Sequence, residues 1–197
     1  ARYDQQGCYS PHMLYVQRGG PVSPQEFAHH LANELTVLQH KLPRRELSLE
    51  EASQINTWRE AQVMASLQDA TRTVLGGDTA WHTVVFSDQC IPLAPGPLNR
   101  CVTVVAVDTL DDVMAMLPAQ RDYLQTVGVA AAPEELIPLS ERLGQAGVTR
   151  ICAVGAMTSP EAGWHHDGRF SLLDLVRMVD IDASTERAAE HFTSYEA

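Results

Sequence analysis

Cys8 is the residue of this chain whose type and surroundings best suit covalent chemistry. It lies within residues 5–11, which read Gln-Gln-Gly-Cys-Tyr-Ser-Pro, directly before a short apolar run. A cysteine held on an exposed turn of this kind can bring its thiolate to a carbonyl carbon while backbone N–H groups stabilise the oxyanion that forms. The alternative is an inert thiol, because free cysteines are commonly buried as small hydrophobic residues. Cys8 is therefore a candidate nucleophile that needs support from the surrounding pattern.

The histidines are weaker candidates for chemistry. His12 follows Cys8 by four residues, but a strand that starts beside it would usually point the two side chains to different places, so a Cys–His couple is not assumed. Residues 165–167, His-His-Asp, could suggest metal ligands or an acid–base pair. Adjacent histidines on an irregular turn cannot easily face one ion, and no third ligand is evident. We therefore predict no metal site, and expect a turn that precedes a helix near Ser171.

The other thiols are expected to pack in the core rather than to react. They lie within or beside apolar strands, and they lack the CxxC spacing of a zinc site or a disulfide framework. These residues are Cys90, Cys101 and Cys152. A thiol that attacks a carbonyl carbon needs access, so we expect Cys8 to be more accessible than these three. We expect it at a ligand crevice at the carboxyl end of a sheet, or at a surface that a cofactor domain would cover.

An apolar strand and two long helices are expected to position the Cys8 segment. Residues 13–16, Met-Leu-Tyr-Val, predict a buried strand that ends at a Gly-Gly-Pro turn. Capping boxes at Ser23 and Ser48 predict the starts of two helices, since each serine has a glutamate three residues later. The second helix is expected to continue to about Thr73, because no Gly or Pro interrupts it.

The rest of the chain alternates β-branched runs with helical patterns. The expected strands are residues 83–86, 102–107, 127–130 and 150–154, and the expected helices are residues 110–117 and 134–145. Buried strands that alternate with short helices are typical of a parallel sheet built from right-handed βαβ crossovers. We predict an α/β fold with a mostly parallel sheet and helices on both faces, in a single domain that spans residues 1–197.

The charge of the chain argues against a nucleic acid partner. The formal net charge is −11, and no block of basic residues could follow a phosphate backbone. The adjacent pair Arg44 and Arg45 is interpreted as solvated surface without a role. The longest apolar runs have the length of strands, so no membrane span is expected. No signal peptide opens the chain and the predicted location is cytoplasmic, although a chain that begins with Ala1 has been processed, trimmed or taken from a longer protein.

Two motifs together resemble a known enzyme family. Residues 4–8, Asp-Gln-Gln-Gly-Cys, followed by Ser-Pro and the strand at residues 13–16, resemble the nucleophile segment of the long-chain acyl-CoA reductases of bacterial bioluminescence, the LuxC family. More loosely, this segment is similar to the Gly-Gln-x-Cys segment of aldehyde dehydrogenases. Residues 147–155 and 164–169 resemble the Gly-x-x-Arg-Ile strand and the Trp-Asp-Gly turn of the reductases. The resemblance extends over nearly the whole chain and implies the catalytic domain of the aldehyde dehydrogenase fold.

The resemblance implies that Cys8 attacks an acyl thioester and that the hydride of NADPH then releases a long-chain aldehyde. The implied partner is a fatty acyl-CoA or an acyl-protein thioester, and only Cys8 carries over as a catalytic residue. In the wider superfamily the cofactor domain, the oxyanion-hole amide and the glutamate base precede the nucleophile, and here seven residues do. We therefore expect the C-terminal portion of a longer enzyme, inactive alone or limited to acyl transfer.

No cofactor-binding residue can be named from the sequence. Neither a dinucleotide fingerprint nor a phosphate-binding loop is present. The superfamily's Glu-x-Phe-Gly-Pro segment has only a degenerate counterpart at residues 94–98. Two alternatives stay open: an aldehyde dehydrogenase fragment that oxidises aldehyde to acid or acyl-CoA, and a non-catalytic α/β module used for assembly. Residues 179–182 could be an edge strand that pairs with a second subunit in a homo-oligomer, as the corresponding region does in aldehyde dehydrogenases.

Overall fold

The computed structural model describes residues 2–77, 79–170 and 172–191, and these divide into two units, Ala1–Ala162 and Gly163–Ala197. Each unit is described by itself. The strands of the first unit are β1 (Met13–Gln17), β2 (Arg72–Leu75), β3 (Thr83–Ser87), β4 (Cys101–Val107), β5 (Thr126–Val129) and β6 (Arg150–Ala153). Its α-helices are α1 (Pro24–Lys41), α2 (Leu49–Gln68), α3 (Leu110–Met116) and α4 (Pro133–Ala146), and a 3-10 segment, Leu117–Tyr123, follows α3.

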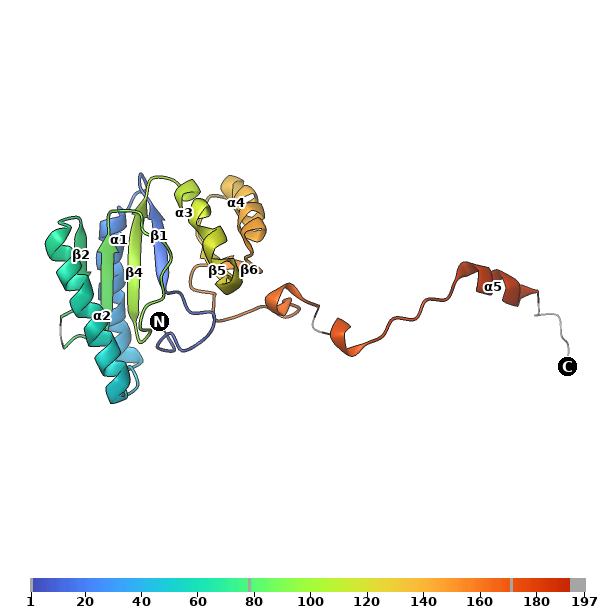
Figure 1. Ribbon diagram of the computed structural model, residues 1–197, viewed down its shortest axis with the longest axis horizontal. Helices are drawn as coiled ribbons and strands as arrows, with labels where there is room; N and C mark the ends of the chain where they lie inside the picture. Colours follow the sequence, from blue (N-terminus) through green and yellow to red (C-terminus); the bar gives the residue numbers. More distant parts are fainter. Residues whose placement is uncertain (1, 78, 171, 192–197) are drawn as a thin grey trace. The chain divides into compact units, whose positions relative to one another are not determined.

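The strands form two sheets rather than one. The larger sheet has the order β1-β4-β3-β2 (Figure 1). In it, β4 pairs in parallel with both β1 and β3, and β2 is antiparallel to β3. β5 and β6 form a separate parallel pair. The predicted α/β fold with mostly parallel pairing is confirmed, but the strands that were expected in a single sheet are divided between two.

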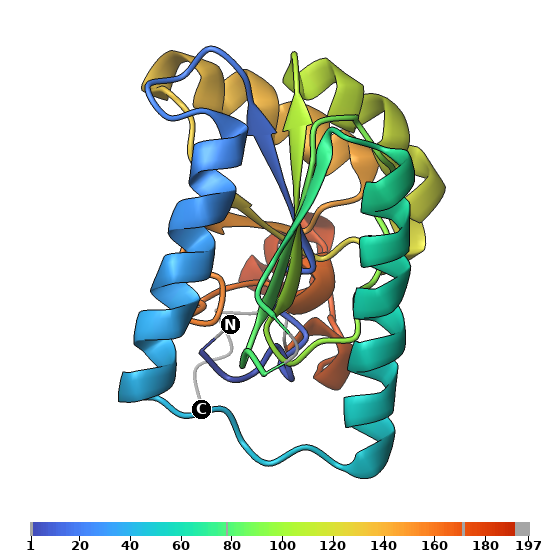
Figure 2. The same ribbon diagram turned by 90° about the vertical axis from the view of Figure 1, so that its left-hand side faces the viewer.

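The central strand β4 is apolar on both faces because helices cover both. Val104 and Ala106 pack against α1, while Val105 and Val107 face a cluster that includes residues of α3 and α4. Figure 2 shows α1 and α2 on opposite sides of the sheet. Side chains alternate between the two faces of a strand, so a run of consecutive Val and Ala residues fits a strand that is buried on both sides.

The two longest helices begin where the capping boxes predicted. The Ser23 hydroxyl accepts a hydrogen bond from the Glu26 N–H at 3.2 Å, and the Glu26 carboxylate accepts one from the Ser23 N–H at 2.9 Å. Ser48 and Glu51 form the same reciprocal pair at 3.1 and 2.9 Å. In the described part of the chain, none of the helices is both long enough and apolar enough to cross a membrane.

α2 is shorter than predicted, and β2 was not predicted. The helix ends at Gln68, and Asp69 follows as its C-cap. The Asp69 carboxylate accepts hydrogen bonds from the N–H and the hydroxyl of Thr71, at 2.9 and 2.5 Å. An Asp side chain that binds the backbone two residues later competes with the helix, and it turns the chain toward the edge of the sheet.

The second unit contains short elements. They are a 3-10 turn (His166–Gly168), a second 3-10 turn (Leu173–Leu175) and α5 (Ala183–Glu190). The irregular turn predicted for residues 164–169 is confirmed, since Asp167 and Gly168 have φ of 52° and 74°. The glycine permits this bend, because left-handed backbone has no steric cost for it.

Two expectations for the C-terminal part are not met. Ser171, where a helix was expected to begin, lies outside the described residues, and the next α-helix begins at Ala183. Residues 179–182 form no strand, so the expected edge strand is wrong for this structure. The described part of this unit contains no strand, and Val179 and Ile181 are 83% and 72% exposed.

Candidate active site

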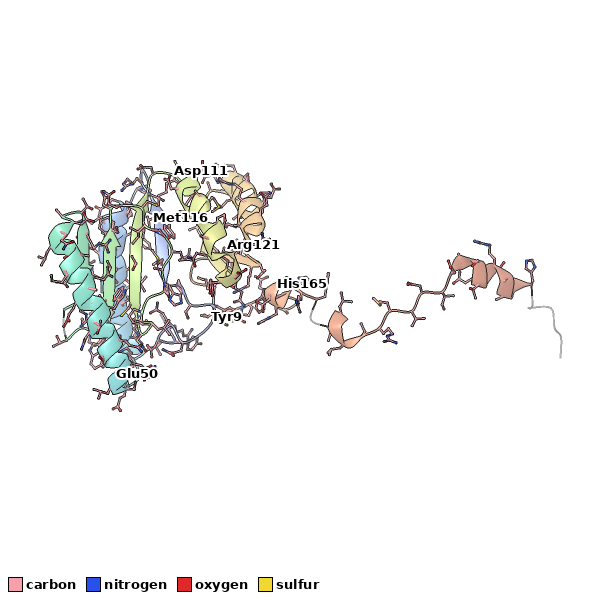
Figure 3. The ribbon with its side chains drawn as sticks, viewed as in Figure 1. Tyr9, Glu50, Asp111, Met116, Arg121 and His165 are labelled. Carbon is pink, nitrogen blue, oxygen red and sulfur yellow. The ribbon has the colours of Figure 1, made fainter. Side chains whose placement is uncertain are left out.

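Cys8 lies in the loop that precedes β1, at the amino end of the parallel strands. In Figure 3 its neighbour Tyr9 lies at the opposite end of the sheet from Asp111, which follows the carboxyl end of β4. The expected crevice at the carboxyl end is therefore wrong for Cys8, whereas the alternative, a surface that a cofactor domain would cover, stays a prediction. Residues directly before a parallel strand must lie at that strand's amino end.

Cys8 is exposed, but exposure alone does not distinguish it from the other thiols. Cys90 was expected in the core and is also exposed, because β3 ends before it. Cys101 is buried, and Cys152 is half-buried on β6, where its thiol donates to a carbonyl of β5. Burial raises the pKa of the Cys101 thiol to about 11, and burial also raises the pKa of the Cys90 thiol. The reactive thiolate is thus disfavoured at both of these residues.

The Gln5 side chain closes the loop that carries Cys8. Its Nε2 donates to the carbonyl of Pro11 at 2.8 Å and to the first carbonyl of β4 at 3.1 Å, and Gln5 is 2% exposed. Inside this loop the Ser10 N–H donates to the carbonyl of Gly7 at 3.0 Å, which makes a tight turn around the cysteine. The two ends of the loop are thereby held together and against the sheet.

Two backbone donors on this turn are available to a ligand. Among the described residues, the N–H groups of Gly7 and Cys8 have no acceptor. Backbone N–H groups beside a nucleophile can stabilise the negative charge that develops on a carbonyl oxygen during attack. The turn therefore combines an exposed thiol with donors of the kind that acyl transfer requires.

The segment of residues 96–101 forms a cradle for the Cys8 loop. The Asn99 N–H donates to the carbonyl of Asp4 at 2.9 Å, and Gln6 Nε2 donates to Asn99 Oδ1 at 3.2 Å. No local pattern in the sequence indicates this contact, because Gln6 and Asn99 are 93 residues apart and the pairing of β1 with β4 brings their segments together. The cradle overlaps residues 94–98, the degenerate counterpart of the superfamily's Glu-x-Phe-Gly-Pro segment. These residues contain no glutamate.

His12 faces the cradle rather than the cysteine. Its Nδ1 accepts a hydrogen bond from the Gly96 N–H at 3.4 Å. Burial lowers the pKa of His12, which favours the neutral ring that such an acceptor requires. No interaction in the described part of the chain joins His12 to Cys8.

A buried ion pair attaches the start of the loop to β4 and α1. Arg100 Nε donates to Asp4 Oδ1 at 2.8 Å, and the two side chains are 1% and 11% exposed. The other guanidinium nitrogens donate to Gln39 Oε1 at 2.9 Å and to the carbonyl of Leu42 at 2.8 Å, at the end of α1. Removing one partner of a buried ion pair typically costs about 3–5 kcal/mol, because the other charge is left uncompensated.

Arg45 is exposed as expected, but Arg44 and Arg45 both contact this junction, so the interpretation that the pair has no role is wrong. The Arg45 N–H donates to Asp4 Oδ2 at 3.2 Å, and its guanidinium forms an ion pair with Glu51. Arg44 Cζ lies 5.5 Å from the ring centroid of Trp81, and its Nη1 donates to the Trp81 carbonyl at 3.2 Å. The connector between α1 and α2 thus packs against the amino end of the sheet.

Both segments of the junction have left-handed backbone at residues other than glycine. Asp4 and Gln5 have φ of 53° and 59°, and Leu98, Asn99 and Arg100 have φ of 62°, 52° and 68°. Such backbone costs about 1–2 kcal/mol per residue, and less at Asp and Asn, which adopt it more readily. These conformations persist only where surrounding contacts determine them, and they cluster at functional sites.

Tyr9 connects the Cys8 loop to β6. Arg150 Cζ lies 5.7 Å from the centroid of the Tyr9 ring. Arg150 opens β6, and its Nη1 and Nη2 donate to the carbonyls of Met157 and Ala156 at 2.6 and 3.1 Å. The cysteine motif and the Gly-x-x-Arg-Ile strand, which are far apart in the sequence, are therefore in contact.

The profile of the acyl-CoA reductase (LuxC) family matches residues 1–178. This chain belongs to the LuxC acyl-CoA reductase family. The matched residues include the Cys8 loop, its cradle and β6, and the predicted family is confirmed. No curated protein matches the sequence.

A LuxC-family reductase needs a hydride donor, but the described residues do not fit the expected NADPH. Pyrophosphates bind at helix N-termini. Each of α1 to α4 has an acidic residue in its first turn, and the Glu26 carboxylate itself accepts from the Ser23 N–H. At the carboxyl ends of the strands, Arg18 is already paired with Asp88 and Asp108, at 2.9 and 2.8 Å. Acidic groups at these positions repel phosphates.

Residues 165–167 form contacts within the second unit. His166 Nδ1 lies 2.9 Å from Asp167 Oδ2, and the His165 ring packs edge-on against Phe170 with centroids 4.7 Å apart. Over residues 2–77, 79–170 and 172–191, no three His, Cys, Asp or Glu side chains form a group that could hold a metal ion. These contacts stabilise the turn at residues 164–169.

Proposed function

We propose that Cys8 accepts the acyl group in this LuxC-family reductase, as the first half of a reaction that converts a fatty acyl-CoA to a long-chain aldehyde. The observation that carries this proposal is the anchored turn, where an exposed thiol lies beside the N–H groups of Gly7 and Cys8, which have no acceptor among the described residues. Of the other thiols, Cys101 is buried at the start of β4 and lacks the access that a thioester requires.

The proposed step is a thioester exchange and involves no oxidation or reduction. The Cys8 thiolate attacks the carbonyl carbon of the acyl-CoA and forms a new carbon–sulfur bond, while N–H donors stabilise the oxyanion. The bond between the carbonyl carbon and the CoA sulfur then breaks. The proton lost by Cys8 ends on the CoA thiol, so one thioester and one thiol are present before and after the step.

The anchoring of the loop supports this chemistry. Gln5 ties the loop ends together, and the Asp4–Arg100 ion pair attaches the loop to β4 and α1. Reacting groups held in a productive geometry need less reorganisation in the transition state. We propose that the loop is kept in one conformation so that the thiol and its oxyanion donors meet the thioester together.

We propose that NADPH supplies the hydride that releases the aldehyde. Because the described residues do not fit a dinucleotide, we propose that NADPH binds elsewhere in the enzyme. Residues 1–197 alone would then carry out acyl transfer at most. Kinship with the aldehyde dehydrogenases, a homo-oligomeric state and a cytoplasmic location stay predictions.

The variants Cys8→Ser and Cys90→Ser test the proposal as a matched pair, because both thiols are exposed. Each protein is incubated with a radiolabelled fatty acyl-CoA without NADPH, and the covalent label is counted after denaturation. Cys8→Ser should lose the label and Cys90→Ser should keep it. The reverse pattern would remove Cys8 from the mechanism, and a wild-type chain that takes up no label would favour a non-catalytic assembly module.

A further inference from the structure

The most deeply buried charged residue that the structure describes is Arg100, which is 1% exposed. Its three guanidinium nitrogens each have a different acceptor: Asp4 Oδ1, Gln39 Oε1 and the carbonyl of Leu42. A planar guanidinium can satisfy three fixed acceptors at once, whereas an ammonium group acts as a compact point charge. The residue is therefore built into the junction of the Cys8 loop, the end of α1 and the start of β4.

These contacts hold two strained segments against each other. Arg100 ends the left-handed run that begins at Leu98, and its partner Asp4 is the first residue of the left-handed pair that opens the Cys8 loop. The Asn99 N–H joins the two runs by donating to the Asp4 carbonyl at 2.9 Å. Without the ion pair, both runs would lose one of the interactions that select their sparsely populated conformation.

We infer that Arg100 is a positioning residue for Cys8, and this inference rests on the proposed function. Arg100 holds the Asp4 carboxylate, Asp4 and Gln5 set the direction in which the chain enters the loop, and the loop presents the thiol and its neighbouring N–H donors. The rate of acylation of Cys8 therefore depends on a side chain that does not touch the thioester. Displacing a reacting group by about 1 Å can slow a reaction on the order of 10²-fold.

The test separates positioning from folding by using two reactions of the same thiol. In the full chain, acylation of Cys8 is measured at saturating acyl-CoA, and simple access to Cys8 is measured as its rate of alkylation by iodoacetamide. Arg100→Lys keeps the charge but not the planar fork. For the folded variant we expect acylation to slow at least about 10-fold, while alkylation stays unchanged or becomes faster.

Arg142→Lys is the matched control, because it makes the same substitution in an exposed ion pair with Asp111, which lies at the opposite end of the sheet from the Cys8 loop. It should keep an acylation rate within about twofold of the wild type, since exposed ion pairs contribute little. If Arg100→Lys does not fold, Asp4→Asn is measured in the same way and should also slow acylation.

Wild-type acylation in a folded Arg100→Lys or Asp4→Asn chain would overturn the inference and leave the proposed function intact. Equal losses of acylation and alkylation would also overturn it, because they indicate a general loss of the folded loop. A wild-type chain that is not acylated at all would refute the proposed function, and the inference with it.

Discussion

Replacing Gln5 by leucine removes the clamp of the Cys8 loop while keeping most of its volume. Gln5 Nε2 makes two hydrogen bonds, and its Oε1 is buried without a partner among the described residues. Each lost bond costs about 1 kcal/mol, and removing an unpaired buried oxygen recovers about 1 kcal/mol. We therefore expect Gln5→Leu to lower the free energy of unfolding by about 1 kcal/mol.

Urea unfolding followed by circular dichroism measures this change. With an m-value of about 2 kcal/mol/M, the midpoint should fall by about 0.5 M. Gln25→Leu is the control, because Gln25 is exposed on α1, has no side-chain hydrogen bond to the described residues, and its substitution should change stability by less than about 0.5 kcal/mol. A loss of more than about 3 kcal/mol in Gln5→Leu would mean that Oε1 accepts a strong hydrogen bond. An unchanged midpoint, with unchanged alkylation of Cys8, would mean that Gln5 does not hold the loop.

Three further predictions concern the thiols, acid and the C-terminal part. Iodoacetamide at about pH 8 should modify Cys8 and Cys90 in the folded chain but spare Cys101, whose burial raises its pKa to about 11; peptide mass spectrometry that finds native Cys101 modified would contradict its burial. Burial lowers the pKa of His82, so the unfolded chain binds the proton more readily, and stability should be full above about pH 6.5 and decrease below it. Thermal unfolding across this range should show a weaker pH dependence in His82→Gln, and an identical dependence would assign the effect to other groups. A chain that ends at Ala162 should keep its thermal midpoint, because both core clusters lie within the first unit, and a large decrease would show that residues 163–197 stabilise it.

Elements whose signals are local could be predicted from the sequence. The helix starts at Ser23 and Ser48 followed from capping boxes, in which both partners lie three residues apart. The end of α2 could not be predicted from hydrophobic spacing, because the Asp69 side chain ends the helix by binding Thr71. The division into two sheets was also missed, since all the strands are similarly apolar and a single sequence does not specify which strands pair.

The nucleophile could be proposed from the sequence, but the contacts that anchor its loop could not. Cys8 lies in a short motif that can be read directly, whereas Asp4 and Arg100 are 96 residues apart and meet only when β1 pairs with β4. The contacts of Arg44 and Arg45 could not be predicted from the sequence, because their partners are far away in the chain. Arg44 contacts the carbonyl and the ring of Trp81, and the Arg45 N–H donates to the Asp4 carboxylate.

The central claim, that Cys8 carries the acyl group, is tested most directly by locating the adduct. Trypsin cleavage after Lys and Arg places each of the four cysteines in a different peptide, and these peptides are residues 3–18, 73–100, 101–121 and 151–169. The wild-type chain is incubated with a fatty acyl-CoA without NADPH, digested and analysed by mass spectrometry. The peptide of residues 3–18 should gain the mass of the acyl group and lose it after treatment with hydroxylamine. An adduct on any of the other three peptides, with none on residues 3–18, would contradict the assignment of Cys8.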